Sequence, residues 1–581
     1  MSLTKASYSM ITGAPVNVKD FGAVGDGVAN DTAALVAAAA ALQDNQTLYF
    51  PSGTYLISAA NATTHQSGAA YGKVVLALTG LSNITILADS AIIKVVNHNC
   101  STGGLTFANF KACQTVAISG FNFEMTFTGV NTSASVYPFC GAITGIDDPD
   151  DGQTQDEING TFTITNCTFN LYHPFGQYAQ SGAPFAGDPN NGYKLYSIFV
   201  SGPYLASTYA AQSRNITIEN CGTKNGHNAY GFWIWAWNNV VVKNCFAENW
   251  VGKYSNASGA LLGGGLSFIR YHQWLCSGIL IDGCNFVSKP CADRTVAGYE
   301  GNSTFVTLDT NLLGDYKHGE SIVANNNVIL GNGDAANSLL DYGVSIYVFG
   351  QVTIENNNFD GIFTTTNAYG GTQVFYNGFA AGGDGSGALI VNGNTFGRAS
   401  SYFDNIRVAN GRNEGEYNRR LKQLVVTNNI SQSQLQYFFD IDTTGSATYF
   451  GCRNVVIQGN VIDGTYNTVW NSSSTNSIAI NYNSNVSTDQ ATISYNQIRY
   501  KYFGLTATAG TPANTPFMSN NLLFFVTASN LLGILWDTVG GTPEGAVAAK
   551  VGSMLLRTNG GAGTTLYIKE SGSGNTGWVA K

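Results

Sequence analysis

A short alternating run that ends in Asn and an apolar residue recurs along most of the chain. Its clearest instances are Ile216–Cys221, Val240–Phe246, Ile279–Phe286, Val352–Phe359, Leu389–Phe396, Val425–Ile430, Val455–Ile462 and Ile493–Ile498. Counted at the last Asn of each copy, the steps from Asn285 to Asn496 are 42, 31, 36, 35, 31 and 36 residues. A fixed local pattern at irregular spacing indicates one structural unit that carries loops of variable length.

The alternation within each copy predicts β-strands, because apolar residues that recur at every second position give a strand one buried face. An antiparallel sandwich would require a turn every 8–12 residues, and the observed period is about three times longer. We therefore expect an all-β chain built as a right-handed parallel β-helix. The recurring Asn can adopt the left-handed conformation at a bend, and stacked copies can form a hydrogen-bonded ladder.

The composition excludes several other classes. Only 11% of the 581 residues are charged, too few for a coiled coil or a large helical bundle. The net charge is −9 and the only adjacent basic pair noted is Arg419–Arg420, so we expect no nucleic-acid partner. No run approaches the roughly 18 apolar residues of a membrane span, so we expect no membrane insertion.

The cysteines follow the repeat. Cys167, Cys221 and Cys245 each come directly after the repeated Asn, and Cys284 precedes one. We interpret them as reduced thiols in a narrow core, made in a reducing cytoplasm. No Cys/His spacing for zinc occurs, and the acidic stretch 147–151 is more typical of a solvated turn than of a Ca²⁺ loop. We therefore expect no metal and no cofactor.

The two ends differ from the repeats. Residues 16–32 predict a strand, a Gly-rich turn and Asn30 or Asp31 as N-cap of a helix that runs to about Gln43 and plugs the end of the solenoid. Three short strands joined by Gly-rich turns are predicted within residues 552–581. We expect a cap over residues 1–58, a β-helix over 59–525 and a small C-terminal β domain over 526–581, with a role in trimerisation or glycan binding.

Residues 14–58 resemble the opening of the pectate-lyase/polygalacturonase-like β-helix superfamily as it occurs in bacteriophage tailspikes. Residues 541–581 are similar to a small terminal module of phage tail fibres and tailspikes. The resemblance implies a homotrimer in the virion, attached to the phage tail or to an adapter protein. It also implies a protein made in the host cytoplasm that acts outside the cell on a capsule or O-antigen polysaccharide, which it binds and usually depolymerises.

Glycosidic hydrolysis requires two carboxylates. Equivalent positions on adjacent coils of a β-helix lie about 4.8 Å apart, which approximates the retaining geometry, and skipping one coil approaches the inverting one. The candidate catalytic residues are Glu248, Asp293, Asp309, Asp315 and His318. The segment 309–320 loosely resembles the acid and His-Gly elements of polygalacturonases, but the Asn-Thr-Asp and Asp-Asp elements of that family are absent. Each acid taken alone is also compatible with a solvated loop charge.

Three indoles alternate along one predicted strand. Trp233, Trp235 and Trp237 share a face, and Ile234 lies on the opposite one. The indoles are expected to face outward, where they can stack on sugar rings or be covered by a loop or at a trimer axis. The other candidate substrate-binding residues are Tyr230, Arg270, His272 and Arg294.

Two further functions remain open at this stage. A polysaccharide lyase would use His318, Lys317 or Tyr316 as base and Arg294 to neutralise a uronate. A non-catalytic adhesin would bind glycan without cleaving it. The sequence leaves open the host strain, the linkage, the stereochemical outcome and whether the groove lies within or between subunits.

Overall fold

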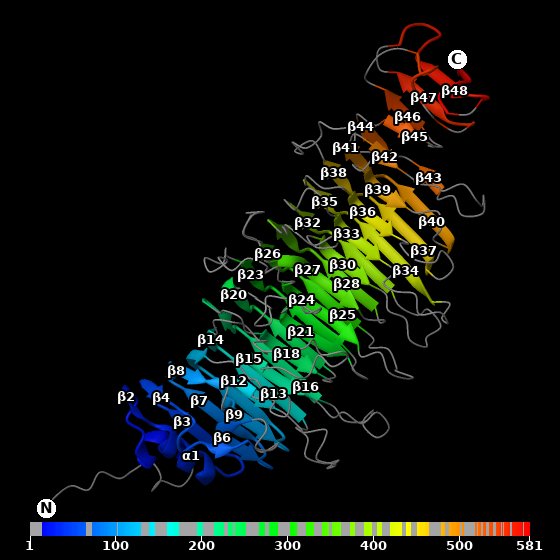
Figure 1. Cartoon of the computed structure of the whole chain (residues 1–581). Helices are drawn as coiled ribbons and strands as arrows, with labels where there is room; N and C mark the ends of the chain where they lie inside the picture. The colour runs from blue at the N-terminus through cyan, green and yellow to red at the C-terminus, as the bar shows by residue number, and fades with distance from the viewer. Residues whose placement is uncertain are drawn as a thin grey trace, which may run out of the picture. The chain divides into compact units, whose positions relative to one another are not determined.

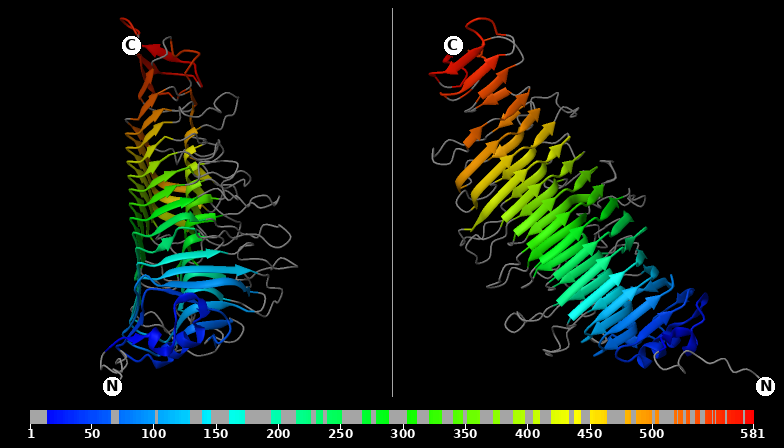
Figure 2. Two further views of the ribbon diagram at one scale, coloured as in Figure 1. Left: turned by 90° about the vertical axis from the view of Figure 1, so that its left-hand side faces the viewer. Right: turned by 180° about the vertical axis from the view of Figure 1, so that it is seen from behind.

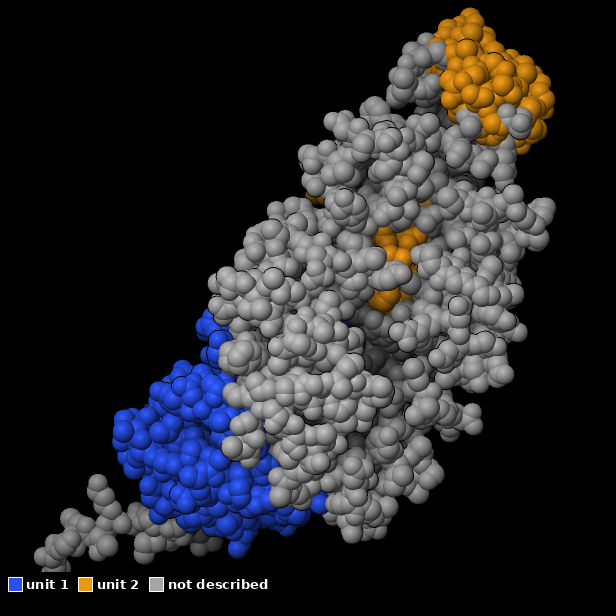
Figure 3. All heavy atoms as spheres, in the orientation of Figure 1, with its two compact units in different colours: residues 1–311 blue, residues 312–581 orange. Residues whose placement is uncertain are grey.

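The computed structural model divides the chain into two compact units, residues 1–311 and 312–581 (Figure 3). The residues that the structure describes are 14–65, 72–100, 103–128, 139–145, 160–172, 194–201, 214–225, 230–235, 239–250, 267–273, 278–288, 303–310, 321–330, 340–347, 351–361, 372–377, 388–397, 404–409, 419–432, 437–442, 450–463, 478–482, 487–499, 502–504, 517–519, 521–524, 527–529, 534–537, 542–547, 549, 551–557, 560–572 and 574–581.

Three sheets run the length of the first unit, and each coil contributes one strand to each sheet (Figure 1). Sheet A contains β1 (Val16–Asn17), β3 (Thr47–Phe50), β7 (Ile84–Ala88), β10 (Val116–Ser119), β13 (Gly160–Thr165), β16 (Arg214–Glu219), β19 (Asn239–Lys243) and β22 (Gly278–Asp282). Sheet B contains β2 (Asp26–Asn30), β4 (Thr54–Leu56), β8 (Ile92–Asn99), β11 (Asn122–Thr128), β14 (Thr168–Tyr172), β17 (Gly222–Thr223), β20 (Phe246–Trp250) and β23 (Asn285–Ser288). Sheet C contains β5 (Thr63–Thr64), β6 (Lys73–Thr79), β9 (Leu105–Lys111), β12 (Phe139–Gly145), β15 (Lys194–Ser201), β18 (Tyr230–Trp235), β21 (Ser267–Gln273) and β24 (Ser303–Thr310).

The second unit repeats the same three-sheet plan (Figure 2). Its sheet A strands are β25 (Ser321–Asn325), β28 (Gln351–Glu355), β31 (Ala388–Asn392), β34 (Arg419–Thr427), β37 (Phe450–Gln458), β40 (Ser487–Ser494) and β43 (Phe517–Ser519). Those of sheet B are β26 (Val328–Leu330), β29 (Asn358–Asp360), β32 (Thr395–Phe396), β35 (Ile430–Ser431), β38 (Val461–Asp463), β41 (Gln497–Arg499) and β44 (Leu522–Phe524). Sheet C has β27 (Leu340–Tyr347), β30 (Thr372–Asn377), β33 (Asp404–Ala409), β36 (Tyr437–Asp442), β39 (Ile478–Tyr482), β42 (Tyr502–Gly504) and β45 (Thr527–Ser529).

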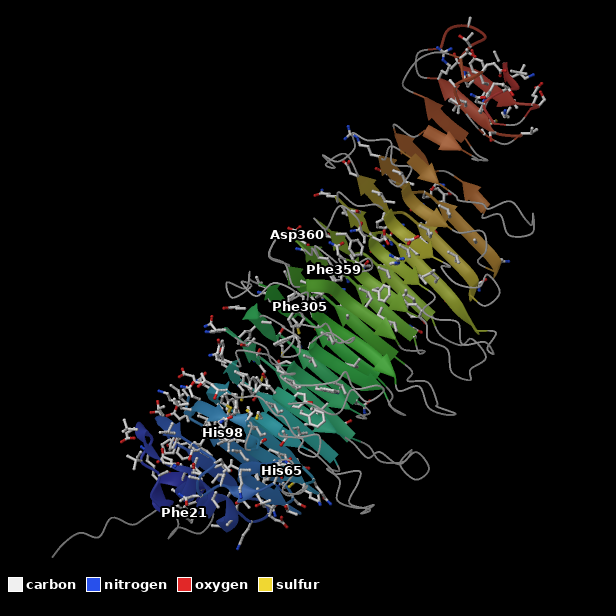
Figure 4. The ribbon with its side chains drawn as sticks, in the orientation of Figure 1. Phe21, His65, His98, Phe305, Phe359 and Asp360 are labelled. Atoms are coloured by element: carbon white, nitrogen blue, oxygen red, sulfur yellow. The ribbon has the colours of Figure 1, made fainter. Side chains whose placement is uncertain are left out.

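Strands that lie one coil apart pair in parallel, and like residues stack in the interior. Val116 pairs with Phe162, and Ile118 with Ile164, and all four are buried. Phe305 and Phe359 are likewise fully buried within their own coils (Figure 4). Stacking of this kind gives every coil a neighbour to bury against, which a single coil lacks. The right-handed parallel β-helix expected from the sequence is confirmed.

The turn between sheets A and B uses two consecutive residues with different roles. The first has a positive φ, as at Asn326 (φ 54°), Asn356 (φ 55°) and Asn428 (φ 56°). The second is buried, and it is the second that forms the ladder. The expectation that one Asn both bends the chain and forms the ladder was therefore wrong. Asn358, used above to count the repeat, is a third residue that already begins β29 and is exposed.

In the second unit the buried turn position is Asn in every described coil. The column contains Asn327, Asn357, Asn394, Asn429, Asn460, Asn496 and Asn521. Each Nδ2 donates to the Oδ1 of the next Asn at 2.9–3.0 Å, and each backbone N–H donates to the same Oδ1 at 2.9–3.1 Å. The predicted amide ladder is therefore confirmed.

In the first unit the equivalent buried position is Cys in four coils. Cys167, Cys221, Cys245 and Cys284 are at most 1% exposed. Together with Cys100, Cys113 and Cys140 they are free thiols. The four cysteines predicted to lie in the core are therefore buried there as free thiols, and the structure adds three further buried thiols.

The helix α1 (Thr32–Ala41) packs against β6 and η2 (Val18–Phe21) in the first unit (Figure 1). Asp31 is its N-cap by position, but the side chain that caps it belongs to Asn30, whose Oδ1 accepts from the Thr32 N–H at 3.1 Å. The Asp31 carboxylate accepts instead from Val24 N–H at 2.6 Å and so fixes the Gly-rich turn. The helix ends two residues before the predicted Gln43, because Leu42 is extended.

The C-terminal module is a four-stranded sheet with the order β46 (Ile534–Asp537), β47 (Met554–Arg557), β48 (Leu566–Lys569) and β49 (Trp578–Ala580). The last three strands are antiparallel and fall within the segments predicted from the sequence. Glu544 accepts from the backbone N–H groups of Trp578 at 2.7 Å and Gly577 at 3.1 Å, and the Trp578 bond is the main reason why the pKa of Glu544 is lowered. β45, a strand of sheet C, reaches residue 529, four residues past the predicted end of the solenoid.

Candidate functional site

Sheet C of the first unit places most of the predicted substrate-binding residues on neighbouring rungs. In β18 the Phe232 ring contacts Phe169 of sheet B, with centroids 6.3 Å apart, so Phe232 faces the interior. Trp233, the next residue, therefore lies on the opposite face of the sheet. Ile234 is fully buried. The predicted separation of Trp233 from Ile234 is consistent with this arrangement.

Trp233 belongs to an aromatic group on sheet C, but it is not an open platform. Its ring meets Tyr196 at 5.4 Å and Phe199 at 5.6 Å, both edge-on, and the side chain is only 7% exposed. Tyr196 and Phe199 are themselves stacked at 4.8 Å. Neither was singled out from the sequence, although both lie in the mainly apolar segment that becomes β15.

The register of β18, β21 and β24 aligns three candidates in one row. Trp235 pairs with His272, and His272 pairs with Asp309. The adjacent rungs are about 4.8 Å apart, so this row places an imidazole-bearing residue one rung from a carboxylate-bearing one. We call the row Trp235–His272–Asp309 the acid–base row.

A second row lies two residues earlier on the same strands. Trp233 pairs with Arg270, and Arg270 pairs with Thr307. Tyr230 begins β18, two coils before β24. Six of the predicted residues therefore fall on three consecutive sheet C strands, namely Tyr230, Trp233, Trp235, Arg270, His272 and Asp309.

Glu248 is separated from this group. It lies exposed on β20 of sheet B, where it pairs with Val287. Glu248 and Trp233 therefore lie on strands of different sheets, since β20 belongs to sheet B and β18 to sheet C. Of the remaining predicted residues, Trp237, Asp293, Arg294, Asp315, Tyr316, Lys317 and His318 lie outside the described residues, as does the acidic stretch 147–151.

A charged cluster in the second unit was missed by the sequence analysis. Arg407 of β33 lies 3.9 Å from the Asp404 carboxylate and 3.8 Å from that of Asp440 on β36. Both carboxylates are at most 3% exposed. The signal was present as acids inside apolar strand runs. Because one guanidinium compensates both buried charges, the cluster is well suited to joining two rungs of sheet C.

Within the described ranges, no group of three or more His, Cys, Asp and Glu side chains is arranged to hold a metal ion. In the same ranges, no helix is both long and apolar enough to cross a membrane.

Comparison with known proteins gives similarities to several solved structures and a partial match to one family model. The solved structures include the surface adhesin PfbA of Streptococcus pneumoniae (14% identity, 98% of this chain and 99% of that one, TM-score 0.43). A second is the A-module of the Azotobacter vinelandii mannuronan C-5 epimerase AlgE6, with 18% identity, 76% of this chain and 98% of that one covered, and a TM-score of 0.38. A third is tailspike protein 3 of bacteriophage CBA120, with 10% identity, 96% of this chain and 67% of that one covered, and a TM-score of 0.32.

The sequence matches are more local. A stretch of 97 residues is 38% identical to the Azotobacter vinelandii mannuronan C5-epimerase AlgE6 and spans 16% of this chain and 11% of that protein. Residues 15–252 match the family model described as rhamnogalacturonase A/epimerase, pectate lyase-like. The match to this family is therefore confined to residues 15–252, less than half of the chain.

Proposed function

We propose that this protein is a phage tailspike that binds a bacterial surface polysaccharide and cleaves it on sheet C of the first unit. The observation that carries the proposal is the acid–base row, in which Trp235, His272 and Asp309 occupy one register position on three consecutive strands. Glycan processing needs an acid–base group beside an aromatic residue that can stack on a sugar ring, and this row offers both residue types.

The rungs have the right spacing for a polysaccharide. Three rungs span about 10 Å, which is on the order of two sugar rings. Arg270 lies on the same strand as His272, two residues away, and pairs with Trp233. A cationic residue between aromatic ones suits a glycan that carries carboxylates, as many capsules do.

Hydrolysis is the first chemistry that we propose. It requires a second carboxylate beside Asp309, either about 5–5.5 Å away for retention or about 6.5–9.5 Å away for inversion. Among the described strands of this face, Asp309 is the only acid between β15 and β24. Asp293 and Asp315, two candidate acids that flank β24 in the sequence and lie outside the described residues, are the proposed partners.

Elimination is the second candidate, and a specific observation favours it. His272 and Asp309 are register partners, and Arg270 lies two residues from His272. A lyase needs a base to remove the proton at C5 of a uronate and a cation to neutralise the carboxylate, so His272 and Arg270 supply both residue types. The family match to an epimerase model and the local identity to a C5-epimerase support proton abstraction from a uronate.

The virion assignment is supported by the two ends of the chain. The Gly-rich turn held by Asp31 and the module of β46–β49 are the features through which the sequence resembles tailspikes. We propose a homotrimer attached to a phage tail or adapter protein, made in the host cytoplasm and active at the host surface. Light scattering of the purified protein tests the trimer directly.

Purified capsule and O-antigen polysaccharides from a panel of bacterial strains test the activity. Incubation with the protein is expected to shorten at least one of them, measured by size-exclusion chromatography. Mass spectrometry then separates products that have gained water, which indicate hydrolysis, from products with an unsaturated uronate, which indicate elimination. Binding to a polysaccharide whose length never changes would instead indicate an adhesin and overturn the cleavage proposal.

A further inference from the structure

Two buried thiols of the first unit lie close enough to form a covalent link between successive coils. The Sγ atoms of Cys100 and Cys140 are 3.0 Å apart. Cys100 follows β8 of sheet B, whereas Cys140 lies in β12 of sheet C. A disulfide bond is about 2.05 Å long, so an approach of about 1 Å would bring the sulfur atoms into bonding distance.

We propose that Cys100 and Cys140 form a disulfide when the folded protein meets an oxidising medium. Two thiols then lose two protons and two electrons to a two-electron oxidant such as diamide, a diazene that is reduced to the hydrazine, and one S–S bond forms. The proposal does not depend on the glycan-processing function, because it concerns only the chemistry of this pair.

The link would enclose one complete coil. Between Cys100 and Cys140 the chain passes through β9 in sheet C, β10 in sheet A and β11 in sheet B. The bond would therefore close a ring of one full turn of the solenoid, about 40 residues long, and would restrict the unfolded chain accordingly. Among the described thiols, Cys245 also contacts Cys284 and Cys167 contacts Cys221 through their side chains, so Cys100–Cys140 is one of three thiol pairs that would enclose a coil.

Burial determines how fast the link can form. Cys100 is 1% exposed and Cys140 is 2% exposed, so an oxidant must wait for a local opening. The mutual contact and burial also raise the pKa of Cys100, which disfavours the reactive thiolate. We therefore expect slow oxidation at neutral pH that accelerates as the pH rises.

The thiols at the buried turn position, Cys167, Cys221, Cys245 and Cys284, offer an internal comparison. Cys221 and Cys245 donate to backbone carbonyl groups at 3.5 Å and 3.4 Å, and these contacts hold their sulfur atoms in the ladder. Cys113 donates to the carbonyls of Leu78 and Lys111, and among the described residues no other thiol contacts it. Cys113 is the matched buried thiol that should stay reduced.

The test uses the reduced full chain treated with diamide under native conditions. Remaining thiols are blocked with N-ethylmaleimide, the protein is unfolded and digested, and cross-linked peptides are identified by mass spectrometry. We expect a peptide pair joined through Cys100 and Cys140, its loss in Cys140→Ser and its retention in Cys113→Ser. The oxidised protein should also unfold at a temperature about 5 °C higher than the reduced protein.

Two results would overturn the proposal. Recovery of both cysteines as maleimide adducts after prolonged oxidation of the folded protein would show that the pair does not react. Recovery of either cysteine joined to another partner would show that a different pairing is preferred. The cross-linked peptide is read in the unsubstituted chain, so a variant that fails to fold does not weaken the test.

Discussion

The two units of the solenoid fill the same position in the coil with different chemistry. At the turn between sheets A and B the first unit buries Cys167, Cys221, Cys245 and Cys284, whereas the second buries Asn from Asn327 to Asn496. Both residue types follow a residue of positive φ, such as Asn244 (φ 51°) or Asn428 (φ 56°). The backbone geometry is therefore common, and only the buried group changes.

Both columns satisfy the same backbone groups. The Cys245 Sγ donates to the carbonyl of Ile218, three residues before Cys221 in the previous coil. Asn429 Nδ2 donates to the carbonyl of Val391, three residues before Asn394. The acceptor is equivalent in the two units, but the hydrogen bond from the Asn429 amide is 3.0 Å long and the one from the Cys245 thiol is 3.4 Å long.

The amide column adds a second set of bonds. The Oδ1 of Asn429 accepts from both the backbone N–H and the Nδ2 of Asn394, at 2.9 Å and 3.0 Å. A thiol is a weak donor and a weak acceptor, so its hydrogen bonds stabilise the fold less than those of an amide. The comparison predicts that substitutions at the buried turn position cost little stability in the first unit and much more in the second.

Asn429→Ala should have the largest effect. It removes the partner of the Val391 carbonyl and of two donors of Asn394, all buried. Leaving such groups unsatisfied costs 1–3 kcal/mol each, so we expect the free energy of unfolding of the second unit to fall by about 4 kcal/mol. Urea denaturation followed by hydrogen exchange of β34 and β37 measures it.

Two further variants, one at Asn428 and one at Asn429, sharpen this test. Asn428→Gly, at the exposed positive-φ residue, should change the free energy of unfolding by only a few tenths of a kcal/mol. Asn429→Cys should be milder than Asn429→Ala, because a thiol makes weak versions of the same contacts. Equal losses from Asn429→Cys and Asn429→Ala would contradict the equivalence of the columns.

Acid should weaken the first unit through His65. Burial, with a smaller effect of Lys111, lowers the pKa of His65 from 6.5 to about 4. Because the folded-state pKa is below the unfolded value, the stabilisation is complete above about pH 6.5 and is lost as the pH falls toward 4. The loss is about 3 kcal/mol at most.

Denaturation between pH 4 and pH 7 measures this effect. The pH slope in that window should be smaller in His65→Gln than in the unsubstituted chain, with the difference confined to peptides of the first unit in hydrogen exchange. An unchanged slope would show that His65 does not titrate between the two states. His98 provides a second, smaller contribution, because burial lowers its pKa as well.

Cys245→Ala should be mild by comparison with Asn429→Ala. The thiol gives up contacts of 3.4 Å to the carbonyls of Ile218 and Lys243, and the small void costs little more. We expect the first unit to lose about 1 kcal/mol in urea denaturation. A loss as large as that of Asn429→Ala would remove the distinction between the two units.

The smallest effect concerns Tyr495, which occupies the positive-φ position in its coil. Its φ is 56° and its side chain is 58% exposed. Asn tolerates this conformation better than an aromatic residue, so Tyr495→Asn should raise the free energy of unfolding by about 0.5–1 kcal/mol. A decrease would mean that the Tyr495 ring makes a stabilising contact that outweighs the backbone strain.

The fold could be predicted because it repeats. The alternating strands, the bend residue and the ladder are local patterns, and each copy reinforces the interpretation of the others. The different roles of the turn residues could not be predicted, because residues 356–358 are all Asn. Asn356 bends the chain, Asn357 is buried in the core and Asn358 begins a strand. That difference depends on the neighbouring coils.

The candidate site was predictable only in part. The indole alternation placed Trp233 correctly opposite Ile234, since strand geometry alone decides it. The pairing of His272 with Asp309 depends on the number of residues in the whole coil between β21 and β24, which includes β22 and β23 and which no local pattern gives. The cluster of Asp404, Arg407 and Asp440 was not predictable, because the two acids lie on different strands of sheet C and only the register brings both to Arg407.

The rate of polysaccharide cleavage by two variants tests the central claim most directly. The substrate is the polysaccharide that the unsubstituted protein shortens, and the variants are Asp309→Asn on sheet C and Glu248→Gln on sheet B. We predict that Asp309→Asn lowers kcat/KM by roughly 100-fold or more, whereas Glu248→Gln stays within about twofold of the unsubstituted protein. Full activity in Asp309→Asn together with a large loss in Glu248→Gln would place the chemistry on the other sheet and contradict the account.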